Sequence, residues 1–289
     1  MKRILIPTDF SDISKNSIVY GFKLAEKLSM QVHLIHILEL YKFAAGTSET
    51  ELISTILPVE NIKEMEASAA ESFKKIMDDL KPHLSPAVPF ETKVISGHLV
   101  NELMVETAIE DTALMIVAVA SSQDLISRFT NSTISAIVED SACPVMIIPS
   151  GFTFTNIQKV ILATDFNKAD LEILKQFTEL FESFDPEIKV LHISAKTNND
   201  FKTELKFAGF KQMVLEKIKY PKMSFMLANN KNIVQGITES LKNENADLLL
   251  MLKEHEGFFK SLFETSKTEK ITHYIKIPMI SFHEVNSKK

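Results

Sequence analysis

Short apolar runs alternate with longer amphipathic segments along this chain. The short runs are rich in Val, Ile and Leu, which is typical of strands buried on both faces. The longer segments carry apolar residues at helical spacing, three or four positions apart. This alternation predicts strand-helix-strand crossovers, and therefore an α/β fold with a parallel sheet covered by helices on both faces.

The first half of the pattern predicts five strands and four helices. The strands are expected at Arg3–Thr8, Gln31–Leu38, Phe90–Ile95, Leu114–Val119 and Val145–Ile148, and the helices at Ile13–Leu28, Glu60–Leu80, Val100–Ile109 and Ser132–Asp140. The second half predicts five more strands, at Val160–Thr164, Glu187–Ile193, Lys222–Leu227, Leu248–Leu252 and Met279–Phe282.

The chain is an internal repeat, because "KRILIPTDF" at Lys2–Phe10 returns as "KVILATDF" at Lys159–Phe166. Asp9 and Asp165 are 156 positions apart, and so are the histidines of "LIHI" and "VLHI". We therefore expect two domains of one fold, at residues 1–150 and 157–285, joined by the short segment Pro149–Asn156.

Matching residues later in the two halves are separated by fewer positions than 156. Asp111 and Asp247 are 136 positions apart, and Pro144 and Pro278 are 134 apart. The first domain must therefore contain about 20 additional residues, which we place around 39–58. This insertion follows the second strand, so it is expected to act either as a lid over a ligand or as a contact for a second chain.

The last strand of each half, "PVMIIP" and "IPMISF", is apolar and uncharged. An exposed edge strand of this kind is an aggregation hazard. We therefore expect the two last strands to pair with each other, which makes the chain a pseudo-dimer of its own halves.

Composition narrows the possible partners. The net charge is −6 and no long block of one sign occurs, so neither nucleic acid nor an anionic membrane surface is favoured. The only cysteine, Cys143, cannot form an intramolecular disulfide and is expected to be a small buried residue. No signal peptide or membrane span is predicted, so we expect a cytoplasmic protein.

The aspartates that follow the first strand of each half are candidates for ligand binding. In an open parallel sheet, ligands lie beyond the carboxyl ends of the strands, where Asp9 and Asp165 are expected. Each carboxylate either caps the following helix or contacts a ligand. For Asp9 both alternatives stay open, because Ser11 or Asp12 offers another cap; for Asp165 capping is favoured.

On three segments, "ILIPTDFS", "DTALMIVAV" and "SACPVMIIPS", the chain resembles the universal stress protein family of the tandem type. The resemblance implies two Rossmann-like (adenine nucleotide alpha hydrolase-like) domains about a pseudo-twofold axis, each with a five-stranded parallel sheet. Nucleotide-binding members carry Gly-x2-Gly-x9-Gly followed by Ser or Thr after the fourth strand. That spacing falls here on Ala118, Ser121, Asn131 and Ser132, so all three glycines are replaced.

The resemblance also implies a site in the first domain for ATP with magnesium or for another adenine nucleotide. By that correspondence the adenine and ribose lie against Pro7, Thr8 and Asp9, with Ile37 and Leu38 beside the base. The phosphates lie against Ala118, Ser121, Asn131, Ser132 and Thr133, and Arg128 adds positive charge. Ser132 and Thr133 are expected to begin a helix and cap it.

In the second domain the same spacing falls on Leu252, His255, Thr265 and Ser266. The bulky residues at the first two positions predict that this half is closed to ATP. The apolar stripe that follows is expected to be core or, less often, an interface; it consists of Phe258, Phe259, Leu262 and Phe263.

No motif for a metal site or for catalysis is present. His36 and His192 are expected in the core, and His98 beside a helix end. The leading hypothesis is a binding or regulatory module, and whether two such chains pair into a further homodimer stays open. The alternatives are an interaction scaffold without a nucleotide or, less favoured, a slow nucleotide hydrolase or transferase that uses Asp9.

Overall fold

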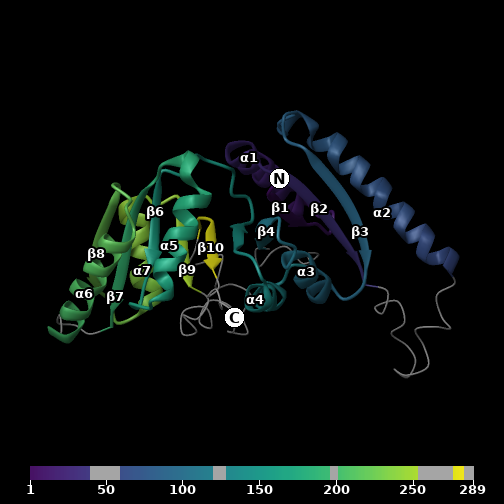
Figure 1. The fold of residues 1–289 in the computed structure, drawn as a ribbon. Helices are drawn as coiled ribbons and strands as arrows, with labels where there is room; N and C mark the ends of the chain where they lie inside the picture. Colours follow the sequence, from purple (N-terminus) through teal and green to yellow (C-terminus); the bar gives the residue numbers. More distant parts are fainter. Residues whose placement is uncertain (40–58, 120–127, 196–200, 253–275, 283–289) are drawn as a thin grey trace, which may run out of the picture.

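A computed structural model describes residues 1–39, 59–119, 128–195, 201–252 and 276–282. The described strands form one ten-stranded sheet in the order β3-β2-β1-β4-β5-β10-β9-β6-β7-β8, with helices on both faces (Figure 1). The α/β class predicted from the alternating pattern is confirmed. None of the helices in these ranges is long and apolar enough to cross a membrane.

The first half supplies five parallel strands. They are β1 (Arg3–Pro7), β2 (Gln31–Leu38), β3 (Phe90–Ser96), β4 (Thr112–Val119) and β5 (Val145–Pro149). The helices between them are α1 (Asp12–Leu28), α2 (Val59–Leu80), α3 (Leu99–Thr107) and α4 (Asn131–Asp140), with a short 3-10 turn, η2, at Lys81–His83. All nine predicted elements of this half are present within about three residues of their expected ends.

The second half repeats this arrangement. Its strands are β6 (Lys159–Ala163), β7 (Glu187–Ser194), β8 (Met223–Asn229), β9 (Leu248–Leu252) and β10 (Met279–Phe282). The described helices are α5 (Ala169–Leu180), α6 (Phe201–Lys217) and α7 (Ile233–Glu244), with the 3-10 turn η3 at Glu182–Phe184. The predicted insertion, apart from Glu39, lies outside the described residues.

The two halves join through their last strands, as the apolar sequences predicted. β10 runs antiparallel to β5, with Met279 opposite Ile147 and Ser281 opposite Val145. Every residue of both strands is buried. This pairing merges two five-stranded parallel sheets into one and leaves β3 and β8 as the outer strands.

The core consists of one hydrophobic layer on each face of the sheet. Along β1 the side chains alternate, so that Ile4 and Ile6 join one layer and Leu5 the other. The first layer includes buried residues of α1, α2, α5 and α6, and the second those of α3, α4 and α7. Both layers contain residues of both halves, so the core continues through the β5–β10 junction.

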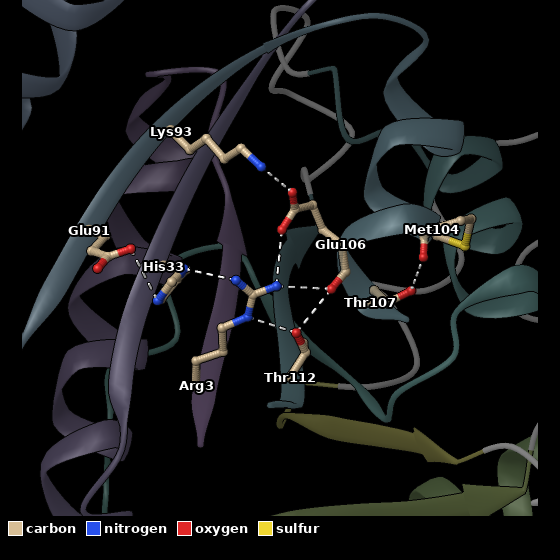
Figure 2. A network of polar contacts seen from close by, with 8 residues as sticks. All are labelled: Arg3, His33, Glu91, Lys93, Met104, Glu106, Thr107 and Thr112. Carbon is tan, nitrogen blue, oxygen red and sulfur yellow. Dashed lines mark hydrogen bonds and ion pairs between the residues drawn. The ribbon is translucent and has the colours of Figure 1, made fainter. Parts of the chain in front are cut away.

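At the amino ends of the strands, a buried arginine ties four elements of the first half together (Figure 2). Arg3 Nη2 donates to Glu106 Oε2 at 3.0 Å, Nε donates to Thr112 Oγ1 at 2.8 Å, and Nη1 donates to His33 Nδ1 at 3.0 Å. Lys93 Nζ binds the other oxygen of Glu106 at 2.6 Å. Burial alone would raise the pKa of the Glu106 carboxyl, but its contacts with Lys93 and Arg3 lower the pKa by a larger amount. The pKa of Glu106 therefore lies below its ordinary value. No local sequence motif indicates this network, because Arg3 and Glu106 are 103 positions apart.

The network gives a first test. In Arg3→Met the buried Glu106 carboxylate loses the partner that is itself buried, so we expect a loss of about 3–5 kcal/mol in the free energy of unfolding. Lys93→Met is the matched control, because the Lys93 side chain is 58% exposed and its loss costs about 1 kcal/mol or less. Urea titration measures both, and equal losses would contradict the assignment of the arginine as the main partner.

Candidate functional site

The structure brings most of the predicted site residues to one edge of the sheet. Strands β2, β1 and β4 are neighbours, so their carboxyl ends lie side by side. Pro7 ends β1, Ile37 and Leu38 end β2, and Ala118 lies next to the last residue of β4. All four are buried, as is Thr8. Ser121 lies outside the described residues.

Asp9 lies at the centre of this edge. Its Oδ1 accepts hydrogen bonds from the backbone N and the hydroxyl of Ser11, at 3.1 and 2.5 Å, and its Oδ2 accepts from the backbone N of Arg128 at 2.9 Å. Burial raises the pKa of this carboxyl, but the hydrogen bonds from Ser11 and Arg128 outweigh burial and leave the pKa below its ordinary value. Asp9 is therefore an ionised hydrogen-bond acceptor at neutral pH.

The two alternatives for Asp9 are now separated, because Ser11 is the N-cap of α1. The Ser11 hydroxyl accepts from the backbone N of Ser14 at 3.3 Å. Asp9 does not cap the helix but binds the cap residue and Arg128.

Arg128 connects the ends of β1 and β2. Its backbone binds Asp9, while its guanidinium Nη1 donates to the carbonyl of Ile37 at 2.8 Å and lies 4.0 Å from Glu39 Oε2. Glu39 is 3% exposed and its Oε1 accepts from the backbone N of Leu99, the first residue of α3. Glu39 was predicted only as the start of the insertion, and no local motif indicates its contact with Arg128 or with α3.

The start of α4 differs from the prediction by one position. Thr130, not Ser132 or Thr133, is the N-cap, and its hydroxyl accepts from the backbone N of Thr133 at 3.4 Å. The hydroxyls of Ser132 and Thr133 each lie 3.0 Å from that of Thr130. α4 begins at Asn131, so the first-turn N–H groups of this helix face the same end of the sheet as Asp9.

The turn after β1 contains a phenylalanine with an unusual backbone. Phe10 has φ 62°, in the left-handed region that non-glycine residues rarely occupy. Its ring stacks on His36 with centroids 4.4 Å apart, and its N–H donates to the hydroxyl of Thr8 at 3.0 Å. Because a carbonyl can only accept, His36 Nδ1 carries a proton and donates it to Thr8 at 2.8 Å. Burial lowers the pKa of His36, which favours a neutral, structural ring, as expected for this residue.

The second half builds the same turn. Phe166 has φ 72°, stacks on His192 at 4.1 Å, and donates its N–H to Thr164. His192 Nδ1 in turn lies 2.7 Å from the carbonyl of Thr164. The repeated "TDF" triplet therefore encodes a strained turn that a histidine of the neighbouring strand supports.

For Asp165 the favoured capping role is wrong. The N-cap position of α5 belongs to Lys168, which makes no side-chain cap bond, and Asp165 Oδ1 accepts instead from the backbone N of Asn167 at 3.2 Å. Leu252 is the buried last residue of β9. The other second-half candidates, His255, Thr265 and Ser266, and the stripe Phe258, Phe259, Leu262 and Phe263 lie outside the described residues.

Two further expectations are confirmed. Cys143 is 4% exposed, and burial raises the pKa of its thiol to about 11, so it is not a nucleophile at neutral pH. His98 occupies the N-cap position of α3 without a side-chain cap bond. Within the described ranges, no group of three or more His, Cys, Asp or Glu side chains is placed to hold a metal ion.

Together, the sheet order, the crossover helices and the polar groups at the carboxyl edge define a protein of the Rossmann-like α/β class. Residues 1–149 match the sequence model of the universal stress protein family. The chain belongs to the universal stress protein family.

Individual relatives agree with this assignment. A universal stress protein of Methanocaldococcus jannaschii is 24% identical over 149 residues, which are 51% of this chain and 81% of the relative. The crystal structure of a universal stress protein from Archaeoglobus fulgidus aligns over 99% of this chain and 97% of its own, with a TM-score of 0.67 and 18% identity.

The cytoplasmic domain of a prokaryotic cation chloride cotransporter also has this fold, with a TM-score of 0.53 and 10% identity over 97% of this chain and 94% of its own. The fold therefore serves more than one function, and the function must be argued from the site.

Ser11 gives the test of the site geometry, because it caps α1 and binds Asp9. We expect Ser11→Ala to lower the free energy of unfolding by about 1 kcal/mol and to raise the pKa of Asp9 towards its ordinary value. Urea titration and NMR titration of the carboxyl carbon measure the two effects. Ser132→Ala, an exposed serine outside any cap position, is the control; an unchanged Asp9 pKa in Ser11→Ala would contradict the role of the hydroxyl.

Proposed function

We propose that the first half binds an adenine nucleotide and that the protein acts in the cytoplasm as a nucleotide-responsive binding or regulatory module rather than as an enzyme. We infer that residues 1–150 and 157–285 are its two domains. The observation that carries the proposal is the ionised Asp9, fixed by Ser11 and Arg128 beyond the carboxyl end of β1.

The described residues fit the ribose end of a nucleotide. An ionised carboxylate can only accept hydrogen bonds, and the hydroxyls of a ribose are donors that match it. The carbonyl of Ile37 and the buried side chain of Leu38, at the end of β2, offer a polar and an apolar contact for a base. The guanidinium of Arg128 donates a hydrogen bond to that carbonyl, so a base that bound the carbonyl would displace the guanidinium.

The phosphate end has fewer partners. The N-terminus of α4 offers backbone N–H groups and the hydroxyls of Ser132 and Thr133 to an anion. Ala118 replaces the first glycine with a methyl group that is already buried in β4. With no described metal cluster, magnesium would be held through the phosphates, and we assign no residue to it.

The direct test is calorimetric titration of ATP with magnesium into the wild-type chain and into Asp9→Asn. We expect one site per chain and an affinity that is at least about tenfold lower in the variant, because a hydrogen bond to a charged acceptor is lost. Asp165→Asn is the matched control, since it changes the equivalent aspartate of the second half; its affinity should equal that of wild type.

Other outcomes select the alternatives. No saturable heat in wild type, with no nucleotide co-purified, would contradict the proposal and favour an interaction scaffold. ATP turnover that Asp9→Asn abolishes would favour a hydrolase or transferase instead.

Arg128 allows the phosphates to be separated from the nucleoside. We expect Arg128→Ala to weaken ATP binding by about tenfold, because a partly exposed cation that pairs loosely with Glu39 is available to a phosphate. Adenosine, which has no phosphate, should bind this variant at least as well as it binds wild type, because the variant leaves the Ile37 carbonyl open to the base. An equal loss for both ligands would show that Arg128 shapes the site without contacting phosphate.

A further inference from the structure

The outer face of α6 is apolar and exposed, which is unusual for a solvent-facing helix. Phe201 is 76% exposed, Leu205 62% and Leu215 45%. α6 lies at the end of the sheet beside the outer strand β8, and its Phe207 contacts Phe225 of that strand (Figure 1). The opposite face carries Phe210 and Val214, which are buried in the core. The exposed apolar side chains of α6 therefore do not pack into the core of the chain.

A glycine at the border of this face, halfway along the helix, has no intramolecular explanation. Gly209 destabilises a helix interior relative to alanine, yet a Cβ at Gly209 would meet nothing within 4 Å. The glycines of α1 and α7 differ, because a Cβ at Gly21 would lie 2.2 Å from Ile6 and one at Gly236 would lie 2.8 Å from Ile193. Those two glycines allow a helix to approach the sheet, whereas Gly209 opens to solvent.

The exposed positions are arranged symmetrically about Ala208, the residue before this glycine. Phe201, Leu205, Ala208, Gln212 and Leu215 follow one another at spacings of four, three, four and three residues and therefore share one face of the helix. If two copies of α6 cross antiparallel at Ala208 and Gly209, Phe201 of one copy meets Leu215 of the other, and Leu205 meets Gln212. The small residues at the crossing let the two backbones approach.

The charged residues at the borders of this face fit the same crossing. Lys211 and Glu204 lie on one border, and Lys202 and Glu216 on the other, all four exposed. In an antiparallel pair each border faces its own counterpart, so Glu204 meets Lys211 of the second copy, and Lys202 meets Glu216. Within one helix Glu204 and Lys211 are seven residues apart, about 10 Å along the axis, too far to pair.

We propose that α6 is a homodimer interface, in which two copies of this chain pack their α6 helices antiparallel about a two-fold axis through Ala208 and Gly209. The charge pattern favours a second copy, because this register places each border acid opposite a lysine of the other copy. Within one chain Lys211 Nζ lies 5.5 Å from the centroid of the Phe225 ring, and Glu216 Oε1 accepts from Gln212 Nε2 at 3.0 Å, so dimer formation exchanges these contacts for ion pairs. One helix pair is a small interface, so the dimer dissociates on dilution.

Sedimentation velocity over a concentration series tests the dimer. Wild type is expected to change from monomer to dimer, and Gly209→Lys to stay monomeric at concentrations at least about tenfold above the wild-type midpoint. The thermal midpoint of Gly209→Lys should equal or exceed that of wild type, since the new side chain enters open space and replaces a helix glycine. A monomeric wild type, or a dimer that Gly209→Lys leaves intact, overturns the proposal.

Charge exchange tests the register. Glu204→Lys and Lys211→Glu should each weaken the dimer, and the double variant should restore it, because the exchanged charges again meet across the axis. Failure of the double variant to recover would exclude the antiparallel register.

A disulfide trap gives an independent readout. Ala208→Cys should form a covalent dimer under mild oxidation, since the only native thiol, Cys143, is buried. Ala70→Cys on α2, an exposed alanine of the corresponding helix in the first half, should remain monomeric. Equal cross-linking of the two variants would indicate random collision and would contradict the interface.

Discussion

The antiparallel hydrogen bonding of β5 with β10 is the constraint on which the rest of the molecule depends. Both strands are fully buried and uncharged, so neither could remain as an open edge in water. Their pairing turns two parallel sheets into one and makes the two hydrophobic layers continuous across the junction. The two halves are therefore held together both by the backbone hydrogen bonds between β5 and β10 and by a shared hydrophobic core.

The same pairing separates the two candidate sites. Each half is parallel within itself, and the halves are antiparallel to each other, so their carboxyl ends lie at opposite edges of the sheet. The turns at Phe10 and Phe166 therefore cannot contribute to one ligand site, although they are built alike. Each half must supply its own polar groups, and among the described residues the first half does so through Asp9, Arg128 and Glu39.

The sequence predicts the features of this structure that a short stretch of chain encodes, and it does not predict contacts between distant residues. The strands and helices followed from apolar periodicity, and the junction followed from two uncharged runs, because burial is encoded in the residues themselves. The sequence offered two residues, Ser11 and Asp12, as the cap of α1, and the structure selects Ser11. The repeat of "TDF" was visible in the sequence, but the left-handed backbone of its phenylalanine was not. The contacts of Arg3 with Glu106, and of Arg128 with Glu39, join residues 103 and 89 positions apart; no local pattern reports such pairs.

The repeat also shows how duplicated halves diverge without losing the fold. At the turn after the first strand, Ser14 of the first half corresponds to Asp170 of the second, and each accepts a hydrogen bond from the preceding threonine. A serine and an aspartate have the same structural role here, because the turn needs only a hydrogen-bond acceptor at that position. Asp9 and Asp165 are identical residues, and each accepts the backbone N–H of the residue two positions on, Ser11 and Asn167. Residue identity in the repeat therefore maintains the turn, whereas in the first half a contact from outside the turn, the backbone N–H of Arg128, also fixes the ionised Asp9 carboxylate.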